Sequence, residues 1–162
     1  PILSAHQKDH GPWQKNIMNM LEGEYKQSDA YRPWMTVDVR DDAAVHVGLL
    51  ESVDVRNGER YIAWSTDTRN VEDICADIDR LLPELGHATP EAPVDDFPDY
   101  IKAREGKYRG IWSGVDLRND RVRRLLGMEF RPLDVSVRDC VESLLQVAKI
   151  KPVQRAGFSL PD

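Results

Sequence analysis

The feature that most restricts the fold of this chain is a shortage of possible strands among many helical segments. Only residues 35–39 and 60–64 have the length and the β-branched or aromatic content of a strand. Helical patterns precede, separate and follow them, and strands that alternate with helices are typical of α/β proteins. A parallel sheet needs neighbouring strands and helices that cover both of its faces. We therefore expect the rest of the sheet to lie on chain beyond these 162 residues.

The first two helices are predicted from apolar residues spaced three and four apart. One begins at Pro12, where a first helical turn tolerates proline, and ends at Gly23. The other is capped by Asp41 or Asp42 and runs to Ser52. Because this second helix is apolar nearly all round, we expect it to be buried on more than one side.

Three further helices are predicted in the second half of the chain. The first carries an apolar stripe and ends near Pro83 or Gly86. The second covers residues 116–126 and ends at Gly127, and Ser136 caps the third. The order of the elements predicts an α/β fold that is rich in helix.

The composition excludes several classes of protein. With 41% hydrophobic and 31% charged residues, the chain is ordinary for a globular protein and unlike a disordered one. Its net charge of −6 argues against a nucleic-acid partner, because an acidic surface repels phosphates. We expect no membrane span, since no apolar run approaches the ~20 residues that cross a bilayer. We expect Cys75 and Cys140 to be buried thiols in the reducing cytoplasm rather than a disulfide.

Three other chemistries have partial patterns. His6 and His10 could share a metal on one helix face, but this stretch has no apolar stripe and no third ligand, so no metal site is predicted. A nucleophile elbow over residues 110–114 would need serine where Trp112 stands. A cluster of arginines fits a solvated helix face better than an anion site. It consists of Arg118, Arg121, Arg123 and Arg124.

Three stretches of the sequence carry a resemblance to one enzyme family. Residues 37–46 read V-D-V-R-D-D-A-A-V-H, residues 58–62 read G-E-R-Y-I, and residues 125–133 read L-L-G-M-E-F-R-P-L. They are similar, in the same order, to the V-D-V-R-D-V-A-x-A-H, G-x-R-Y-I and closing L-L-G segments of the extended short-chain dehydrogenases/reductases. The likeness is greatest to the dihydroflavonol-reductase-like branch. Residues 1–3 also fit the G-P-x-L segment after that family's sixth Rossmann strand, with the glycine missing.

The resemblance implies that residues 1–150 are the C-terminal, substrate-binding half of such a reductase, with residues 151–162 as a loose tail. Its fold would comprise the last strands of a Rossmann-like sheet and a smaller, mostly helical part. The family reduces a ketone or aldehyde with NADP or NAD, using a glycine-rich phosphate loop and a Tyr-x-x-x-Lys pair. This sequence contains neither motif. We therefore expect no catalytic residue here, an inactive isolated chain, and an absent N-terminal Rossmann half as its partner.

The resemblance also implies which residues meet the ligands. The loop at the start of the chain and the beginning of the first helix border the nicotinamide and the substrate, and the residue just before the V-D-V-R-D strand region also faces the substrate, which indicates Met35, with Trp34 nearby. The implied substrate-binding residues are Ser4, His6, Trp13, Trp34 and Met35, and the implied cofactor-binding residues are Pro1 and Trp13. Such an aromatic and apolar pocket suits a hydrophobic carbonyl compound. Trp13 and Met35 can equally be plain core residues.

The first stretch also has an interpretation that needs no family. Asp38 and Asp41 flank Arg40 where a strand passes into a helix. Carboxylates at this position accept hydrogen bonds from free amide groups and interact favourably with the helix dipole. We therefore expect Arg40 and Asp41 to be structural rather than catalytic.

A second hypothesis is a stand-alone, non-catalytic module that binds a small molecule or a partner protein. It accounts for the missing motifs without any loss of chain. It does not account for the shortage of strands, or for a start at Pro1 that reads as a chain joined in mid-fold, by processing or by proteolysis. The two hypotheses differ in whether the gene continues upstream with a glycine-rich loop and a Tyr-x-x-x-Lys pair.

Overall fold

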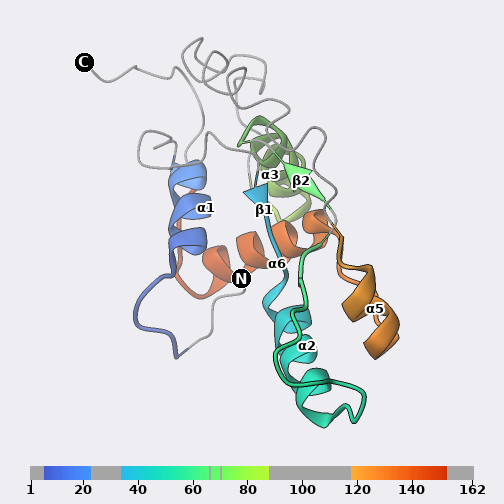
Figure 1. Ribbon diagram of the computed structural model, residues 1–162. Coiled ribbons are helices and arrows are strands. Elements are labelled where there is room, and N and C mark those ends of the chain that lie inside the picture. Colours follow the sequence, from blue (N-terminus) through green and yellow to red (C-terminus); the bar gives the residue numbers. More distant parts are fainter. Residues whose placement is uncertain (1–5, 23–33, 66, 70, 88–117, 153–162) are drawn as a thin grey trace, which may run out of the picture.

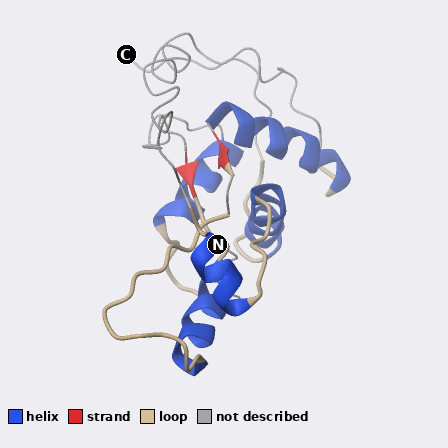
Figure 2. Cartoon of the chain, turned by 45° about the vertical axis from the view of Figure 1, so that its right-hand side comes forward, coloured by secondary structure: helices blue, strands red, loops and turns tan. Residues whose placement is uncertain are grey.

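The computed structural model describes residues 6–22, 34–65, 67–69, 71–87 and 118–152 (Figure 1). Helices dominate these ranges, and the strands are very short (Figure 2). The elements are α1 (Pro12–Glu22), β1 (Trp34–Met35), α2 (Val39–Glu51), β2 (Thr68–Arg69), α3 (Val71–Glu84), α5 (Asp120–Leu126) and α6 (Leu133–Gln146). The predicted α/β class and the division at residue 150 remain predictions.

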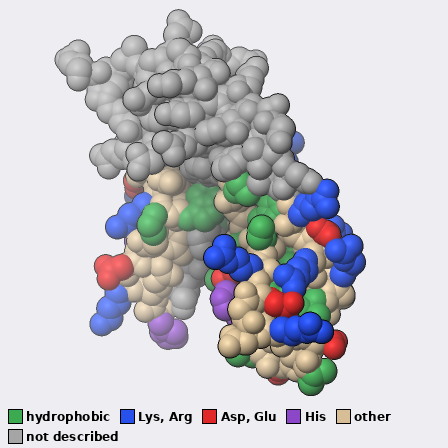
Figure 3. Space-filling model, viewed as in Figure 1, with side chains coloured by type: hydrophobic (Ala, Val, Ile, Leu, Met, Phe, Trp, Pro, Cys, Tyr) green, Lys and Arg blue, Asp and Glu red, His purple; other side chains and the backbone are tan. Residues whose placement is uncertain are grey.

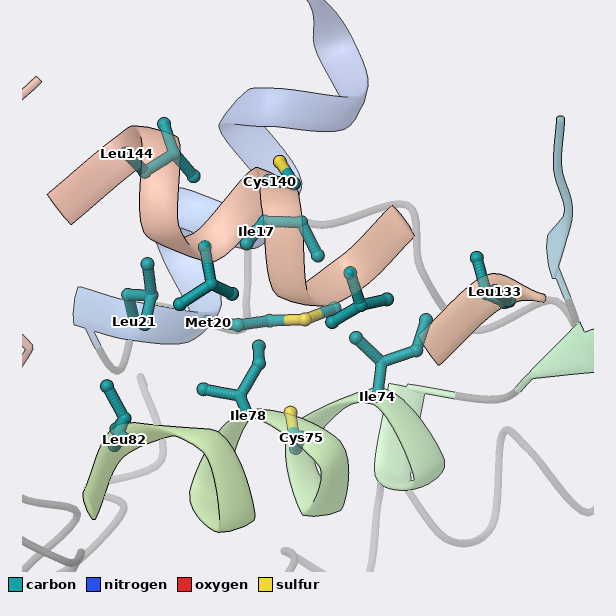
Figure 4. Close-up of a cluster of buried hydrophobic side chains, with 12 residues drawn as sticks. Ile17, Met20, Leu21, Ile74, Cys75, Ile78, Leu82, Leu133, Cys140 and Leu144 are labelled. Atoms are coloured by element: carbon teal, nitrogen blue, oxygen red, sulfur yellow. The ribbon is translucent and has the colours of Figure 1, made fainter. Parts of the chain in front are cut away.

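The hydrophobic core lies where α1 and α3 pack against α6. Each of these helices buries the apolar stripe that its spacing predicts, and Figure 4 shows side chains of α3 pointing toward those of α1 and α6. The core residues are Ile17, Met20, Leu21, Ile74, Cys75, Ile78, Leu82, Leu133, Val137, Cys140, Val141 and Leu144. Both cysteines are buried and free, which confirms their prediction as thiols.

The strands differ from both predictions. β1 and β2 pair antiparallel, with Met35 opposite Thr68. The predicted strand over residues 35–39 is wrong at its end, because the Asp38 carboxylate caps α2 and the backbone becomes helical at Val39. The predicted strand over residues 60–64 is wrong, because this segment is a loop. Its side chains and carbonyls make individual contacts instead of the regular hydrogen bonds of a strand.

The loop over residues 60–64 is tied to α5. Tyr61 donates a hydrogen bond to the Glu59 carboxylate (2.7 Å), and the Arg121 guanidinium lies 4.7 Å above its ring. The Asn119 side chain donates to the Trp64 carbonyl (2.7 Å). Tyr61 is thus half-buried in a loop instead of being a strand core residue.

α5 packs against α2 and places three of the clustered arginines on the surface. Arg121 pairs with Glu59, Arg123 with Glu129, and Arg124 with Asp120. Basic and acidic side chains accordingly lie next to one another on this part of the surface (Figure 3). The prediction of a solvated helix face is confirmed for these three residues.

The ends of α5 agree in part with the sequence. The helix stops at Gly127, as predicted, where φ is +61°, a conformation that favours glycine. Its first residue is Asp120 rather than 116, and residues 116–117 lie outside the described ranges. At its last residue, α5 meets α2 closely: a Cβ at Gly48 would lie 2.9 Å from both methyl carbons of Leu126.

The expectation that α2 is buried on more than one side is wrong for the described residues. Within this helix Asp41 and Val45 are buried, whereas Val47 and Leu50 are 52% and 87% exposed. No helix in the described part of the chain is long and apolar enough to cross a membrane. Most of the predicted C-terminal tail, from residue 153 on, lies outside the described residues.

Candidate functional site

An apolar hollow opens where α1, α6 and the end of β1 meet. It encloses about 10 Å³, roughly the space of one water molecule, and widens toward solvent. Its walls are apolar except for two hydroxyl groups and one thiol. The lining residues are Trp13, Ile17, Thr36, Val37, Leu133, Ser136, Val137 and Cys140. This combination of aromatic, aliphatic and few polar groups is typical of the lining of a small-molecule site. The enclosed volume is far below the about 300 Å³ of such sites, so only a small group of a ligand fits inside the hollow and the rest would lie at its mouth.

The Thr36 hydroxyl is the polar group of the hollow that lacks a partner. Its oxygen is buried and has no hydrogen-bond partner among the described residues. The Thr36 backbone, by contrast, is held firmly, because its carbonyl accepts a hydrogen bond from the Ser65 amide (2.8 Å). A buried hydroxyl without a partner costs about 1–3 kcal/mol, so a ligand or water that reached this oxygen would remove a penalty.

The second hydroxyl, on Ser136, is engaged by a buried carboxylate. It donates to Oδ2 of Asp38 at 2.7 Å, across 98 residues of sequence. The prediction that Ser136 caps its helix is wrong, because α6 begins at Leu133 with Pro132 in the cap position. Ser136 therefore lies in the first turn, where its side chain can reach α2 instead of its own backbone.

Asp38 is the centre of a network behind the hollow. Its carboxylate is 3% exposed and accepts from the Arg40 amide (2.9 Å) and from Nε and Nη2 of Arg40 (2.8 and 2.7 Å). The Arg40 guanidinium also reaches Asp139 of α6 at 2.7 Å. Hydrogen bonds from Arg40 and Ser136 hold the pKa of Asp38 well below its ordinary value despite burial. Asp38, rather than the predicted Asp41 or Asp42, is the cap of α2.

Asp41 makes the second link from α2 to the segment before α6. Its carboxylate is 2% exposed and accepts from the Arg131 amide (2.7 Å) and the Arg131 guanidinium. The structural interpretation of Arg40 and Asp41 is confirmed, since both side chains fix α2 to the C-terminal part of the described chain. The V-D-V-R-D stretch thus forms the frame behind the hollow and supplies Val37 to its lining.

The thiol in the hollow is not a nucleophile. Burial raises the pKa of Cys140 to about 11, so the sulfur stays protonated at neutral pH. Its side chain is 1% exposed and belongs to the core as well as to the wall. Cys140 therefore contributes shape and apolar surface.

The sequence-predicted site residues are only partly brought together. Trp13 lines the hollow, and Met35 is half-buried in β1 beside it without being part of the lining. His6 is exposed in the loop before α1. The side chain of Trp34 and the residues Pro1 and Ser4 lie outside what the structure describes.

Sequence reasoning missed Thr36 and Ser136, although each had a signal. The resemblance indicated Trp34 and Met35, whereas the residue that lines the hollow is Thr36, which follows directly after β1. Ser136 follows Leu133 by three residues and precedes Cys140 by four, which makes it a polar residue on an apolar stripe. A polar group at such a position needs a buried partner.

A wider groove between α3 and α6 is lined mainly by side chains that form ion pairs with one another. Arg69 and Arg80 both pair with Asp77, which is 4% exposed. Arg138 pairs with Glu84 at 2.8 Å. Among the described residues, no group of three or more His, Cys, Asp or Glu side chains is placed to hold a metal. The apolar hollow is therefore the better candidate site.

One known protein is similar to this chain. Ketoreductase azaE of Aspergillus niger is 35% identical over 135 residues, which make up 82% of this chain and 36% of that protein. The chain thus spans about a third of the length of this relative. No protein-family model matches the chain, and no solved structure matches it.

Proposed function

We propose that this chain is the substrate-binding part of a NAD(P)-dependent oxidoreductase that reduces a ketone or aldehyde to the alcohol by hydride transfer. The similarity to ketoreductase azaE carries the proposal, and the V-D-V-R-D stretch supports membership of the extended short-chain reductases. The two free, buried cysteines fit a cytoplasmic protein.

The hollow provides what such a substrate needs from this part of the enzyme. The Trp13 ring and the aliphatic side chains would bind the hydrophobic body of the substrate, and the Thr36 hydroxyl would donate to its carbonyl oxygen. That hydrogen bond orients the carbonyl and gives the buried Thr36 hydroxyl the partner it lacks. The chain's own contribution is thus to bind and orient the substrate and to keep water from it.

The described residues do not fit the nicotinamide cofactor by themselves. The hollow, which encloses only about 10 Å³, is too small for a dinucleotide, and the sequence has no Gly-x-Gly loop to receive its phosphates. When bound, NADP or NAD would supply or accept the hydride. We assign its binding, and the proton donor, to an N-terminal Rossmann half on the same gene product.

The direct test is NADPH-dependent reduction of an aromatic ketone such as acetophenone by the full-length gene product. We expect one alcohol formed for each NADPH oxidised. Thr36→Val keeps the shape of the side chain but removes its donor, and should lower kcat/KM roughly 5- to 10-fold. Ser143→Ala is the matched control, since this buried hydroxyl donates to a carbonyl of its own helix, that of Cys140, and Ser143 does not line the hollow. Absence of reduction with all ketones and aldehydes tried would favour the non-catalytic binding module.

A further inference from the structure

One face of α2 is apolar and exposed along the whole helix. Val39, Val47 and Leu50 are 47%, 52% and 87% exposed, and Ala43 is exposed as well. Their spacing of four, four and three residues places them on one side of the helix. We call these four residues the α2 stripe. Val53, which is 96% exposed, follows directly after the helix.

The opposite face of α2 is fixed to the rest of the described chain. Val45 is buried, Asp41 is held by Arg131, and Gly48 lies against Leu126 of α5. The orientation of the helix is therefore set by specific contacts, and the α2 stripe cannot turn inward without breaking them. α2 has two apolar faces, and only one of them has a partner in the described residues.

The α2 stripe is too extensive to be an ordinary scatter of surface residues. Together with Val53 it exposes on the order of 400 Å² of apolar side chain, a size that marks interaction sites on soluble proteins. The opposite face of α2 already has its contacts within the described chain, so a partner of the stripe would form a second layer on this helix.

The geometry points to one occupant of the α2 stripe. It is an apolar face of a nucleotide-binding α/β domain on the same gene product. This inference rests on the proposed function. The similar ketoreductase contains nearly twice as much further chain as the part that this chain matches, since the match takes 36% of its length. Docking within one polypeptide avoids most of the translational entropy that association of separate chains costs.

A second copy of the chain is the less favourable occupant. Two α2 stripes packed together would bury roughly 800 Å² in total, which is below the approximately 1,000 Å² that a specific interface between separate chains needs.

The test is thiol labelling of Leu50→Cys in two forms, the 162-residue chain and the full-length gene product. A maleimide reagent should label position 50 rapidly in the short chain and roughly tenfold or more slowly in the full-length protein, because burial blocks the reagent. Asn57→Cys is the control: it is exposed in the turn after α2, outside the stripe, and should react equally fast in both forms.

Three labelling results would overturn the inference. They are equal labelling of position 50 in both forms, equal slowing at positions 50 and 57, and slowing in the short chain that grows with its concentration, which would identify a second copy. A gene that encodes no further domain would also overturn it. Protection of position 50 in a full-length protein that reduces no carbonyl compound would support the docking surface while removing the proposed reaction.

Discussion

The α1–α3–α6 cluster and the α2–α5 pair are held in place by different kinds of contact. In the cluster, three apolar stripes face one another, and residues such as Ile74, Val141 and Leu144 are completely buried. In the α2–α5 pair, attachment depends on carboxylates: Asp38 and Asp41 bind Ser136 and Arg131, and much of the apolar surface stays exposed. Within the described residues, the apolar stripes of the cluster are covered by one another, whereas α2 has a partner on one side only.

This difference predicts how much stability each region should lose on mutation. Packing in the cluster means that loss of one side chain leaves a cavity. Around α2, loss of an apolar side chain on the stripe should cost almost nothing in this chain, whereas loss of a buried carboxylate should cost much.

The largest expected effect is in the cluster. Leu144→Ala should lower the free energy of unfolding by about 3–4 kcal/mol, because Leu144 is fully buried between α6 and its neighbours. Urea denaturation measures this quantity. A loss below about 1 kcal/mol would contradict the difference between the two regions, because it would mean that the cluster is loosely packed.

The next effect separates the buried carboxylate from an exposed one on the same helix. Asp38→Asn should cost about 2–3 kcal/mol, since the amide places donors against the donors of Arg40 and Ser136. Asp42→Asn, whose side chain is 43% exposed, should change the stability by less than about 0.5 kcal/mol. Equal effects of the two substitutions would contradict the role of Asp38.

The same carboxylate should make stability depend on pH in acid. The pKa of Asp38 is lowered by its hydrogen bonds from Arg40, so its contribution is fully present above the unfolded value of about 3.9. That contribution is lost as the pH falls below about 4 toward the lowered folded pKa. Urea midpoints of the wild type and Asp38→Asn should therefore converge as the pH is reduced, and a constant gap would contradict the ion pair.

The smallest effect is expected on the α2 stripe. Leu50→Ala should change the free energy of unfolding of the 162-residue chain by less than about 0.5 kcal/mol, because the side chain is 87% exposed. The same substitution in a full-length protein should cost 2 kcal/mol or more, on the order expected for a buried leucine, if the stripe docks there. Equal changes in the free energy of unfolding in the two forms would mean that no second layer packs on the stripe.

The sequence predicts what is periodic and local. The stripes of α1, α3 and α6 are visible in the spacing of residues such as Ile74 and Ile78, and the stop at Gly127 follows from its conformational freedom. The cap of α2 was ambiguous because three carboxylates lie within five residues, and only the structure distinguishes Asp38 from Asp41 and Asp42.

The hollow depends on contacts that sequence patterns do not contain. Ser136 and Asp38 are 98 residues apart, and Arg131 and Asp41 are 90 apart. Thr36 and Val37 line the hollow after β1 has ended, and the sequence does not show where a two-residue strand ends, so it indicates Met35 where the structure has Thr36. The exposed stripe on α2 likewise appears only when the partner of each helix face is known.

The measurement that tests the central claim most directly is an NMR titration of the 162-residue chain with acetophenone, followed through the Trp13 indole and the Thr36 methyl resonances. The account predicts that both resonances shift together in a saturable way, and that Thr36→Val weakens the binding roughly 5- to 10-fold. Ser143→Ala should leave the dissociation constant unchanged. Shifts elsewhere in the chain without any at Trp13 and Thr36, or equal affinity of Thr36→Val, would contradict the assignment of the hollow as the carbonyl site.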